Sequence, residues 1–174
     1  MKPNKINKMI YMSLLVGMAL ILFIIEGMIP VPFITPGAKL GLANLVIMIA
    51  VYTLGSYKEA FTVLFLRLLL STMLGGSLST LMYSASGGIL SFIIIIIVKE
   101  LGGKYVSIIG VSAAAAVFHN IGQLIVASLI LKNIGVFLYL PILSIAGIGT
   151  GIFVGISANY LLSHLNKISY LKFD

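Results

Sequence analysis

A handful of polar residues interrupts the long apolar stretches of this sequence, and these residues could do chemistry. The ionisable ones are Glu26, Arg67 and His119. A carboxylate, a guanidinium and an imidazole are costly to bury in apolar surroundings, so each is a functional-site hypothesis by default. Uncharged companions for them are the amides of Asn44, Asn120, Gln123 and Asn159. Asn159 is expected to bond between helices, and the other groups together could recognise a small molecule that is anionic or amphipathic.

The elements that hold these residues are predicted to be membrane-spanning helices. Of the 174 residues, 60% are hydrophobic and only 9% are charged, whereas a soluble domain carries about 25% charged residues. Most of the surface is therefore expected to face lipid, in the cytoplasmic membrane. The net charge of +7 is gathered in a few lysine clusters beside apolar stretches. This indicates anchoring to an anionic leaflet rather than binding of nucleic acid.

Charges, prolines and glycine pairs divide the chain into six predicted spans within a single transmembrane domain, residues 1–174. The spans cover residues 9–29, 39–55, 58–75, 78–98, 105–131 and 136–163. With both termini in the cytoplasm, eight lysines are inside and only Lys39 and Lys132 are outside, which agrees with the positive-inside rule. The predicted fold class is an all-α integral membrane protein, a six-helix bundle. Because the second stretch is short, four or five spans with a re-entrant segment are the alternative.

In this orientation most of the buried polarity lies in the outer half of the bundle. His119, Asn120 and Gln123 are spaced by three and four residues, so they form one polar stripe at or beyond the midpoint of the fifth span. Glu26 is near the outer end of the first span, and Arg67 is about midway along the third. This distribution favours a pocket open to the exterior, with Glu26 orienting Arg67.

The connection before the second span is predicted to place a helix start that attracts anions on the same, outer side. Three prolines stiffen residues 30–37, and Thr35 can cap the next helix with Pro36 at its first position. Free N–H groups at a helix start attract anions, and Lys39 lies beside them. Lys39 and Asn44 therefore join the candidate substrate contacts.

Each candidate also has a purely structural alternative. Arg67 can pair with Glu26 simply to hold the first and third spans together. His119 can be a core histidine bonded to a backbone carbonyl, and Lys39 can extend to the membrane surface. The grouping of these residues on one side supports a binding site more strongly than any one of them does.

Several catalytic chemistries are absent from the sequence. Gly102-Gly103-Lys104 lacks the upstream glycine of a P-loop and is followed by Tyr105. Asp174 is the only aspartate, so paired aspartates cannot hold magnesium; there are no cysteines, and two distant histidines make no zinc site. We therefore expect no catalytic residue, no metal and no cofactor, and we do not expect an enzyme.

Small residues predict where helices approach closely. Gly147, Gly151 and Gly155 repeat every four residues in the last span, and Ser13 and Gly17 have the same spacing in the first. One use of such stripes is packing within the bundle. The other is docking of a partner subunit, for which the stripe on the first span is the better candidate.

Two motifs resemble the signatures of a known family. They are Pro36-Gly37-Ala38-Lys39-Leu40-Gly41-Leu42-Ala43-Asn44 and Phe118-His119-Asn120-Ile121-Gly122-Gln123-Leu124. They are similar to those of the Gx transporter family, whose members are often named heptaprenyl diphosphate synthase component I. That family is in turn similar to the S components of energy-coupling factor transporters. The resemblance covers essentially the whole chain.

The resemblance implies a fold and a division of labour. S components have six helices and a substrate site near the outer face. They dock on a membrane coupling subunit through small residues of the first helix, and two cytoplasmic ATPases supply energy. Ser13-x-x-x-Gly17 is at the position of the S-component Ala-x-x-x-Ala motif but differs from it. The resemblance therefore predicts a substrate-binding subunit of a transporter.

Two other functions remain as alternatives. One is a non-catalytic membrane component that assists synthesis of heptaprenyl diphosphate or the menaquinone side chain. The other is a proton-coupled secondary transporter that uses Glu26 or His119.

Overall fold

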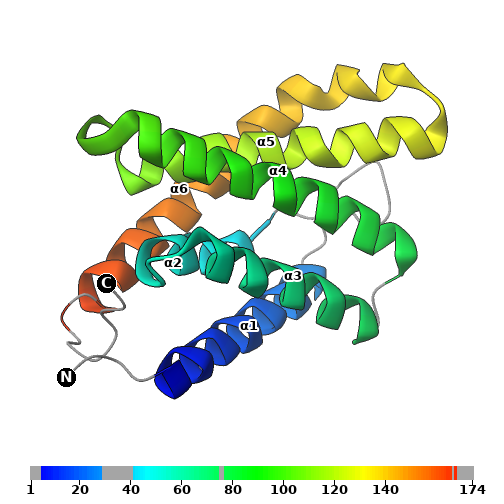
Figure 1. Cartoon of the computed structure of the whole chain (residues 1–174). Helices are drawn as coiled ribbons and strands as arrows, with labels where there is room; N and C mark the ends of the chain where they lie inside the picture. Colours follow the sequence, from blue (N-terminus) through cyan, green and yellow to red (C-terminus); the bar gives the residue numbers. More distant parts are fainter. Residues whose placement is uncertain (1–4, 29–40, 75–76, 166, 168–174) are drawn as a thin grey trace.

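The computed structural model describes residues 5–28, 41–74, 77–165 and 167, and within them the chain is helical without any strand. The α-helices are α1 (Lys5–Met28), α2 (Asn44–Thr53), α3 (Tyr57–Met73), α4 (Leu78–Gly102), α5 (Ile108–Leu131) and α6 (Leu140–Leu165). Short 3-10 helices, η1 (Gly103–Tyr105) and η2 (Ile134–Tyr139), precede α5 and α6. The all-α prediction is confirmed for these residues (Figure 1).

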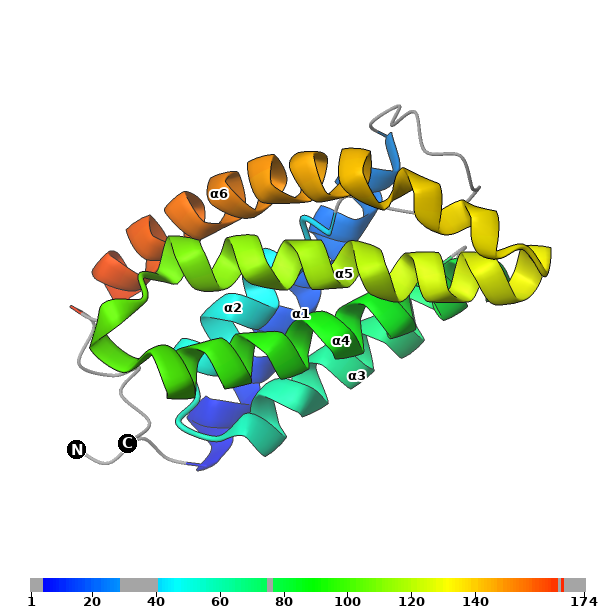
Figure 2. The same cartoon turned by 90° about the horizontal axis from the view of Figure 1, so that it is seen from above.

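The helices run alternately in opposite directions. In Figures 1 and 2, α4, α5 and α6 lie side by side in one group, and α1, α2 and α3 form the other. The first residues of α1 and the last residues of α6 lie at the same end of the bundle in both views. The turn between α2 and α3 and the η1 turn are also at this end.

Among the residues that the structure describes, four segments are long and apolar enough to cross a membrane. They are Lys5–Met28, Leu78–Tyr105, Ile108–Leu131 and Ile134–Leu165. The other two helices are shorter: α2 has 10 residues and α3 has 17. At 1.5 Å per residue these reach about 15 Å and about 25 Å, against a hydrocarbon core of about 30 Å. The structure therefore supports a multi-pass membrane protein with at least one helix that reaches only partway.

Local backbone chemistry explains where the helices differ from the predicted spans. The second was predicted from residue 39, but α2 begins at Asn44, because Gly41 has a positive φ of 87° that a helix cannot contain. The fifth was predicted from Tyr105, but α5 begins after Ser107, whose side chain accepts from the Gly110 N–H at 3.1 Å. The predicted start of the sixth falls in η2.

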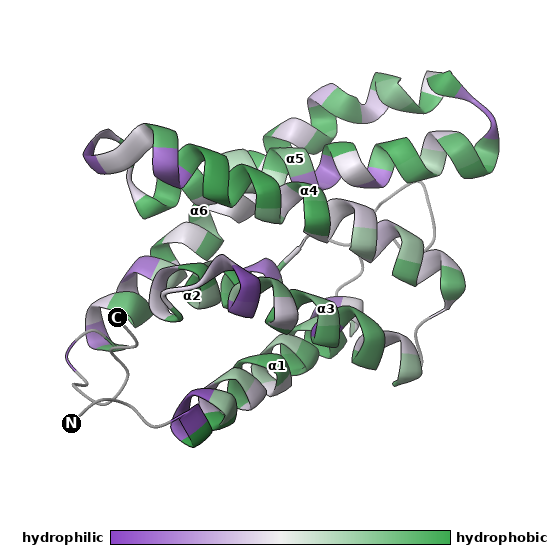
Figure 3. Ribbon diagram, viewed as in Figure 1, coloured by the Kyte–Doolittle hydropathy of each residue, from purple (hydrophilic) through white to green (hydrophobic). Residues whose placement is uncertain are grey.

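The surface agrees with a lipid environment. Figure 3 shows hydrophobic residues along the length of all the long helices, with hydrophilic positions mostly at their ends. Large apolar side chains such as Ile21, Phe65, Leu129 and Phe153 are exposed. A water-soluble fold would bury such groups, so these positions are the lipid-facing side of the bundle.

The glycine stripe of α6 packs inside the fold. A Cβ atom at Gly151 would lie 2.6 Å from the Cα atom of Ala113, and one at Gly155 would lie 2.6 Å from the Cα atom of Ile109. Such distances leave no room for a side chain, so α5 and α6 touch backbone to backbone. In contrast, Ser13 is exposed, and a Cβ atom at Gly17 would have no neighbour within 4 Å.

Lys99 joins α4 to the end of α2. Its ammonium group donates to the Val51 carbonyl at 3.3 Å, and this carbonyl is in the last turn of α2, where no intrahelical partner remains. The same group lies 4.9 Å from the ring centroid of Tyr52 and 5.0 Å from that of Tyr57. A cation at the C-terminus of α2 and over two aromatic faces stabilises the packing of α4 on α2 and on the start of α3.

Replacing Lys99 with methionine is therefore expected to lower the free energy of unfolding by about 1–2 kcal/mol, since both the cation–π contacts and the cap are lost. The matched control is Lys104→Met, because Lys104 is exposed and contacts only the ring of its neighbour Tyr105. Thermal unfolding in detergent measures both variants. Equal effects of the two substitutions would show that the Lys99 contacts contribute nothing special.

Candidate ligand-binding site

Buried polar side chains from α1, α2, α3 and α5 lie in the interior of the bundle. Glu26, Arg67 and His119 are each only 2% exposed. Asn44 and Gln123 are buried as well. Since a buried ionisable group inside a membrane protein needs compensating partners, the contacts of each residue show what it does.

His119 is at the centre of this cluster. The Nδ1 atom of His119 is 3.1 Å from the Asn44 amide nitrogen, and its Nε2 atom is 2.8 Å from the Gln123 amide nitrogen. A neutral imidazole has one N–H and one lone pair, so the two amides cannot both donate to it. The backbone of Gly87 also interacts with the imidazole, beside Nδ1. In the tautomer with its proton on Nδ1, a backbone carbonyl can accept that proton and Nε2 can accept from Gln123.

Two glycines of α4 make space for the cluster. A Cβ atom at Gly87 would lie 2.8 Å from His119 Nδ1 and 2.9 Å from the His119 backbone oxygen. A Cβ atom at Gly88 would lie 3.2 Å from Leu64 Cδ1 and 3.8 Å from Arg67 Nη1. Gly87 therefore leaves room for the imidazole of His119, and Gly88 lies beside the guanidinium of Arg67.

Glu26 and Arg67 interact electrostatically without a direct ion pair. Glu26 Oε1 accepts a hydrogen bond from the Gly41 N–H, which ties the start of the α2 segment to α1. Arg67 feels the charge of Glu26 and also acts on His119. Among the described residues, the ion pair within 4.0 Å is Lys8–Glu59, not Glu26–Arg67. Arg67 and Glu26, which the sequence suggested as a pair, thus interact through their charges at a distance greater than that of a salt bridge.

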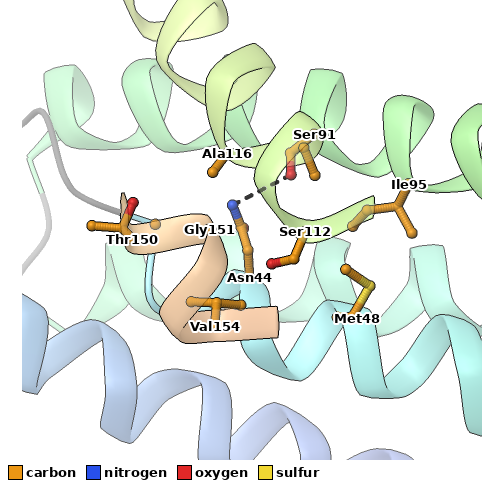
Figure 4. Close-up of a pocket in the computed structure, with 11 residues that line it drawn as sticks. Asn44, Met48, Ser91, Ile95, Ser112, Ala116, Thr150, Gly151 and Val154 are labelled. Carbon is orange, nitrogen blue, oxygen red and sulfur yellow. Dashed lines mark hydrogen bonds between the residues drawn. The ribbon is translucent and has the colours of Figure 1, made fainter. Parts of the chain in front are cut away.

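A small cavity extends from Asn44 along α2 to Met48 and is also lined by α4, α5 and α6. Its volume is about 10 Å³, which is room for about one water molecule. Figure 4 shows the Asn44 amide pointing toward Ser91, with Ser112 of α5 and Thr150 of α6 nearby. The Asn44 nitrogen is 3.4 Å from the Ser91 hydroxyl oxygen. Because sites for metabolites usually measure about 300–1,000 Å³, binding one here requires the helices to separate.

The comparison with known proteins identifies the family. The sequence model described as heptaprenyl diphosphate synthase component I matches residues 15–161. The chain belongs to the heptaprenyl diphosphate synthase component I family. No curated protein and no solved structure matches it.

The matched region of this component I family member contains the whole buried cluster. Glu26, Arg67 and His119 all lie within residues 15–161, whereas Ser13 and Asp174 lie outside them. The family name speaks of a component of a synthase. The described residues of the chain contain no group of three or more His, Cys, Asp or Glu side chains that could hold a metal.

Three further polar residues that the sequence singled out in this family member have different outcomes. Asn120 is buried, but its amide nitrogen donates to the Leu143 carbonyl of the neighbouring α6 at 2.7 Å. A Cβ atom at Gly147 would lie 2.7 Å from that same nitrogen, so Asn120 is held between α5 and α6. Lys39 lies outside the described residues. Asn159 is exposed on α6 rather than buried between helices of the described part of the chain.

Sequence reasoning missed the glycines at 41, 87 and 88 and the hydroxyl of Ser91. Gly41 lines the cavity, and a Cβ atom there would lie 3.0 Å from the Asn44 amide nitrogen. A Gly-Gly pair in the middle of an apolar run is unusual for a helix interior, because glycine weakens it. The Gly87-Gly88 pair in the sequence could therefore have indicated that side chains from other helices pack closely against α4.

Proposed function

We propose that this chain is the membrane-embedded substrate-binding and translocating subunit of a transporter for a small anionic or amphipathic metabolite. The observation that supports this proposal most strongly is a cluster of buried polar side chains from four helices of an apolar bundle: Glu26, Asn44, Arg67, His119 and Gln123. Polar side chains that converge in a membrane interior mark substrate pathways. In this proposal Asn44, His119 and Gln123 contact the substrate directly, with Lys39 as a further contact.

Energy comes from separate subunits in this proposal. The chain has no P-loop, so ATP hydrolysis would belong to two cytoplasmic ATPases joined through a membrane coupling subunit. The resemblance to energy-coupling factor S components supports this assignment. The outward-facing Ser13 and Gly17 of α1 are compatible with it, because they are not used in packing within the chain.

The second candidate is a non-catalytic partner of a prenyl diphosphate synthase, which the family name favours. The third, a proton-coupled secondary transporter, has less support. A second proton on His119 would sit at Nε2, where it would face the Gln123 amide N–H. The hydrogen bonds around the ring therefore suit a neutral imidazole rather than a proton carrier.

Affinity purification of the tagged full chain from its native membranes separates the first two candidates. We expect a membrane coupling protein and two ATPases of the P-loop class to co-purify, as mass spectrometry would identify them. Recovery of a soluble prenyl diphosphate synthase with no ATPase would instead support the synthase-partner function and overturn the proposal.

The topology that we propose has six spans with both termini in the cytoplasm. The natural absence of cysteine makes labelling unambiguous, since every thiol is introduced. In whole cells, an impermeant maleimide is expected to modify Lys132→Cys, in the exposed turn after α5. Lys167→Cys, beyond α6, is expected to react only after permeabilisation. Labelling of both sites in intact cells would contradict a cytoplasmic C-terminus and a membrane-spanning α6.

A further inference from the structure

Arg67 carries hydrogen-bond donors that nothing in the described structure accepts. Its side chain is 2% exposed, and its Nε and Nη1 atoms have no hydrogen-bond partner among the described residues. An unfilled N–H on a buried cation is among the most unfavourable arrangements in an apolar interior. A purely structural arginine would be expected to have its donors filled by neighbouring side chains or backbone.

The nearby carboxylate does not fill them. Glu26 accepts from the Gly41 N–H, and the Glu26–Arg67 interaction is electrostatic rather than a hydrogen-bonded ion pair within 4.0 Å. Glu26 therefore balances the charge of Arg67 while leaving its donors available. Arg67 thus presents unfilled Nε and Nη1 donors beside a carboxylate that acts on it electrostatically.

A glycine without a side chain of its own packs against the guanidinium. Gly88 of α4 lies opposite Nη1, where even a methyl group would be in van der Waals contact at 3.8 Å. His119, with its own amide partners, is close enough to Arg67 for the two to interact electrostatically. An acceptor placed beside Arg67 would therefore lie next to the cluster assigned to the substrate.

We propose that Arg67 binds an oxyanion of the ligand, a carboxylate or a phosphoryl group. This inference rests on the proposed function and assigns the substrate class of the same site. Guanidinium N–H groups form their shortest and strongest hydrogen bonds with oxyanions, which match the planar fork of donors. A neutral carbonyl could also accept from these donors, but its hydrogen bonds would be roughly half as strong as those of an oxyanion. The oxyanion belongs either to a soluble metabolite or to a lipid headgroup, and the two share this chemistry.

Thermal unfolding of the full chain in dodecyl maltoside, a detergent without any oxyanion, tests the inference. The probes are isovalerate, its uncharged isostere isovaleramide, inorganic phosphate and phosphatidylglycerol. We expect at least one oxyanion to raise the melting temperature saturably and isovaleramide to leave it unchanged. A response to isovalerate or phosphate indicates a soluble ligand, and a response to phosphatidylglycerol alone indicates a lipid.

Two variants locate the effect. Arg67→Lys keeps the charge but removes the fork, and it is expected to weaken oxyanion binding about tenfold or more. Gly88→Ala keeps the Arg67 side chain and places a methyl group 3.8 Å from Nη1, so it supplies the same test if Arg67→Lys does not fold. Stabilisation that is equal for isovalerate and isovaleramide, absent for every oxyanion, or unchanged in both variants would overturn the inference.

Failure of the inference differs from failure of the proposed function. If a metabolite is retained by the protein through His119 but an uncharged isostere binds as well as its acid, only the Arg67 assignment is wrong. If no metabolite is retained through His119 while oxyanions still bind at Arg67, the substrate-binding function is wrong and the oxyanion site remains.

Discussion

Replacing Arg67 with methionine is expected to lower the free energy of unfolding by about 3–5 kcal/mol, because it removes a buried positive charge that interacts with the buried carboxylate of Glu26. Both side chains are 2% exposed, so water cannot screen the remaining charge. The double variant Glu26→Gln with Arg67→Met removes both charges and is expected to recover most of that loss. Denaturant or thermal unfolding in detergent measures the wild type, the two single variants and the double variant.

The chain offers a matched control on the same two helices. Lys8 of α1 and Glu59 of α3 form an ion pair at 2.7 Å, but their side chains are 23% and 32% exposed. Lys8→Met is expected to cost under about 1 kcal/mol, as partly exposed pairs do. If the losses from Glu26→Gln and Arg67→Met simply add in the double variant, the two residues are energetically independent and the electrostatic interpretation is wrong.

Replacing Gly151 with alanine is expected to be the next most damaging single change, with a loss of about 1–3 kcal/mol. The added Cβ atom would meet two backbone atoms, at 2.6 Å to the Ala113 Cα atom and 2.9 Å to the Ser112 oxygen, and it would lie 3.0 Å from the Ala116 Cβ atom. Backbone cannot turn aside as a long side chain can, so α5 and α6 must separate. Thermal unfolding measures the loss.

Gly149 is the control for this change. It lies two residues away on the same helix, is exposed, and a Cβ atom there would have no neighbour within 4 Å. Gly149→Ala is therefore expected to be neutral or to stabilise the helix by up to about 1 kcal/mol, the propensity difference between the residues. A loss at Gly149 equal to that at Gly151 would show that helix packing is not the cause.

Much of the fold could be predicted from the sequence, because the length of an apolar run determines a membrane helix almost directly. The runs that became α1, α4, α5 and α6 were found in this way. The start of α2 was predicted too early, since a glycine with positive φ at position 41 cannot be recognised from hydropathy. Whether α2 and α3 count as full spans depends on the bilayer, which hydropathy alone does not decide.

The candidate site was predictable only as a set of residue types. Burial cost singled out Glu26, Arg67 and His119, and the structure buries all three. The stripe argument could not separate Gln123 from Asn120, because helix spacing says nothing of the neighbouring helix. Gln123 faces His119, whereas Asn120 is bonded to α6. Gly87 and Gly88 were missed for the same reason: their role is the space they leave for residues from α5 and α3.

The central claim is that the buried cluster around His119 binds a small metabolite. Small molecules released from the purified full chain can be identified by mass spectrometry and compared among wild type, His119→Asn and His164→Asn. His164 is an exposed histidine near the end of α6, so its substitution controls for the change of residue type.

We expect wild type and His164→Asn to release the same compound in similar amounts. His119→Asn, which removes the Nε2 contact with Gln123, is expected to retain about tenfold less, as loss of a buried hydrogen-bonding group predicts. Equal retention by folded His119→Asn protein, or no retained compound in any of the three, would contradict the account.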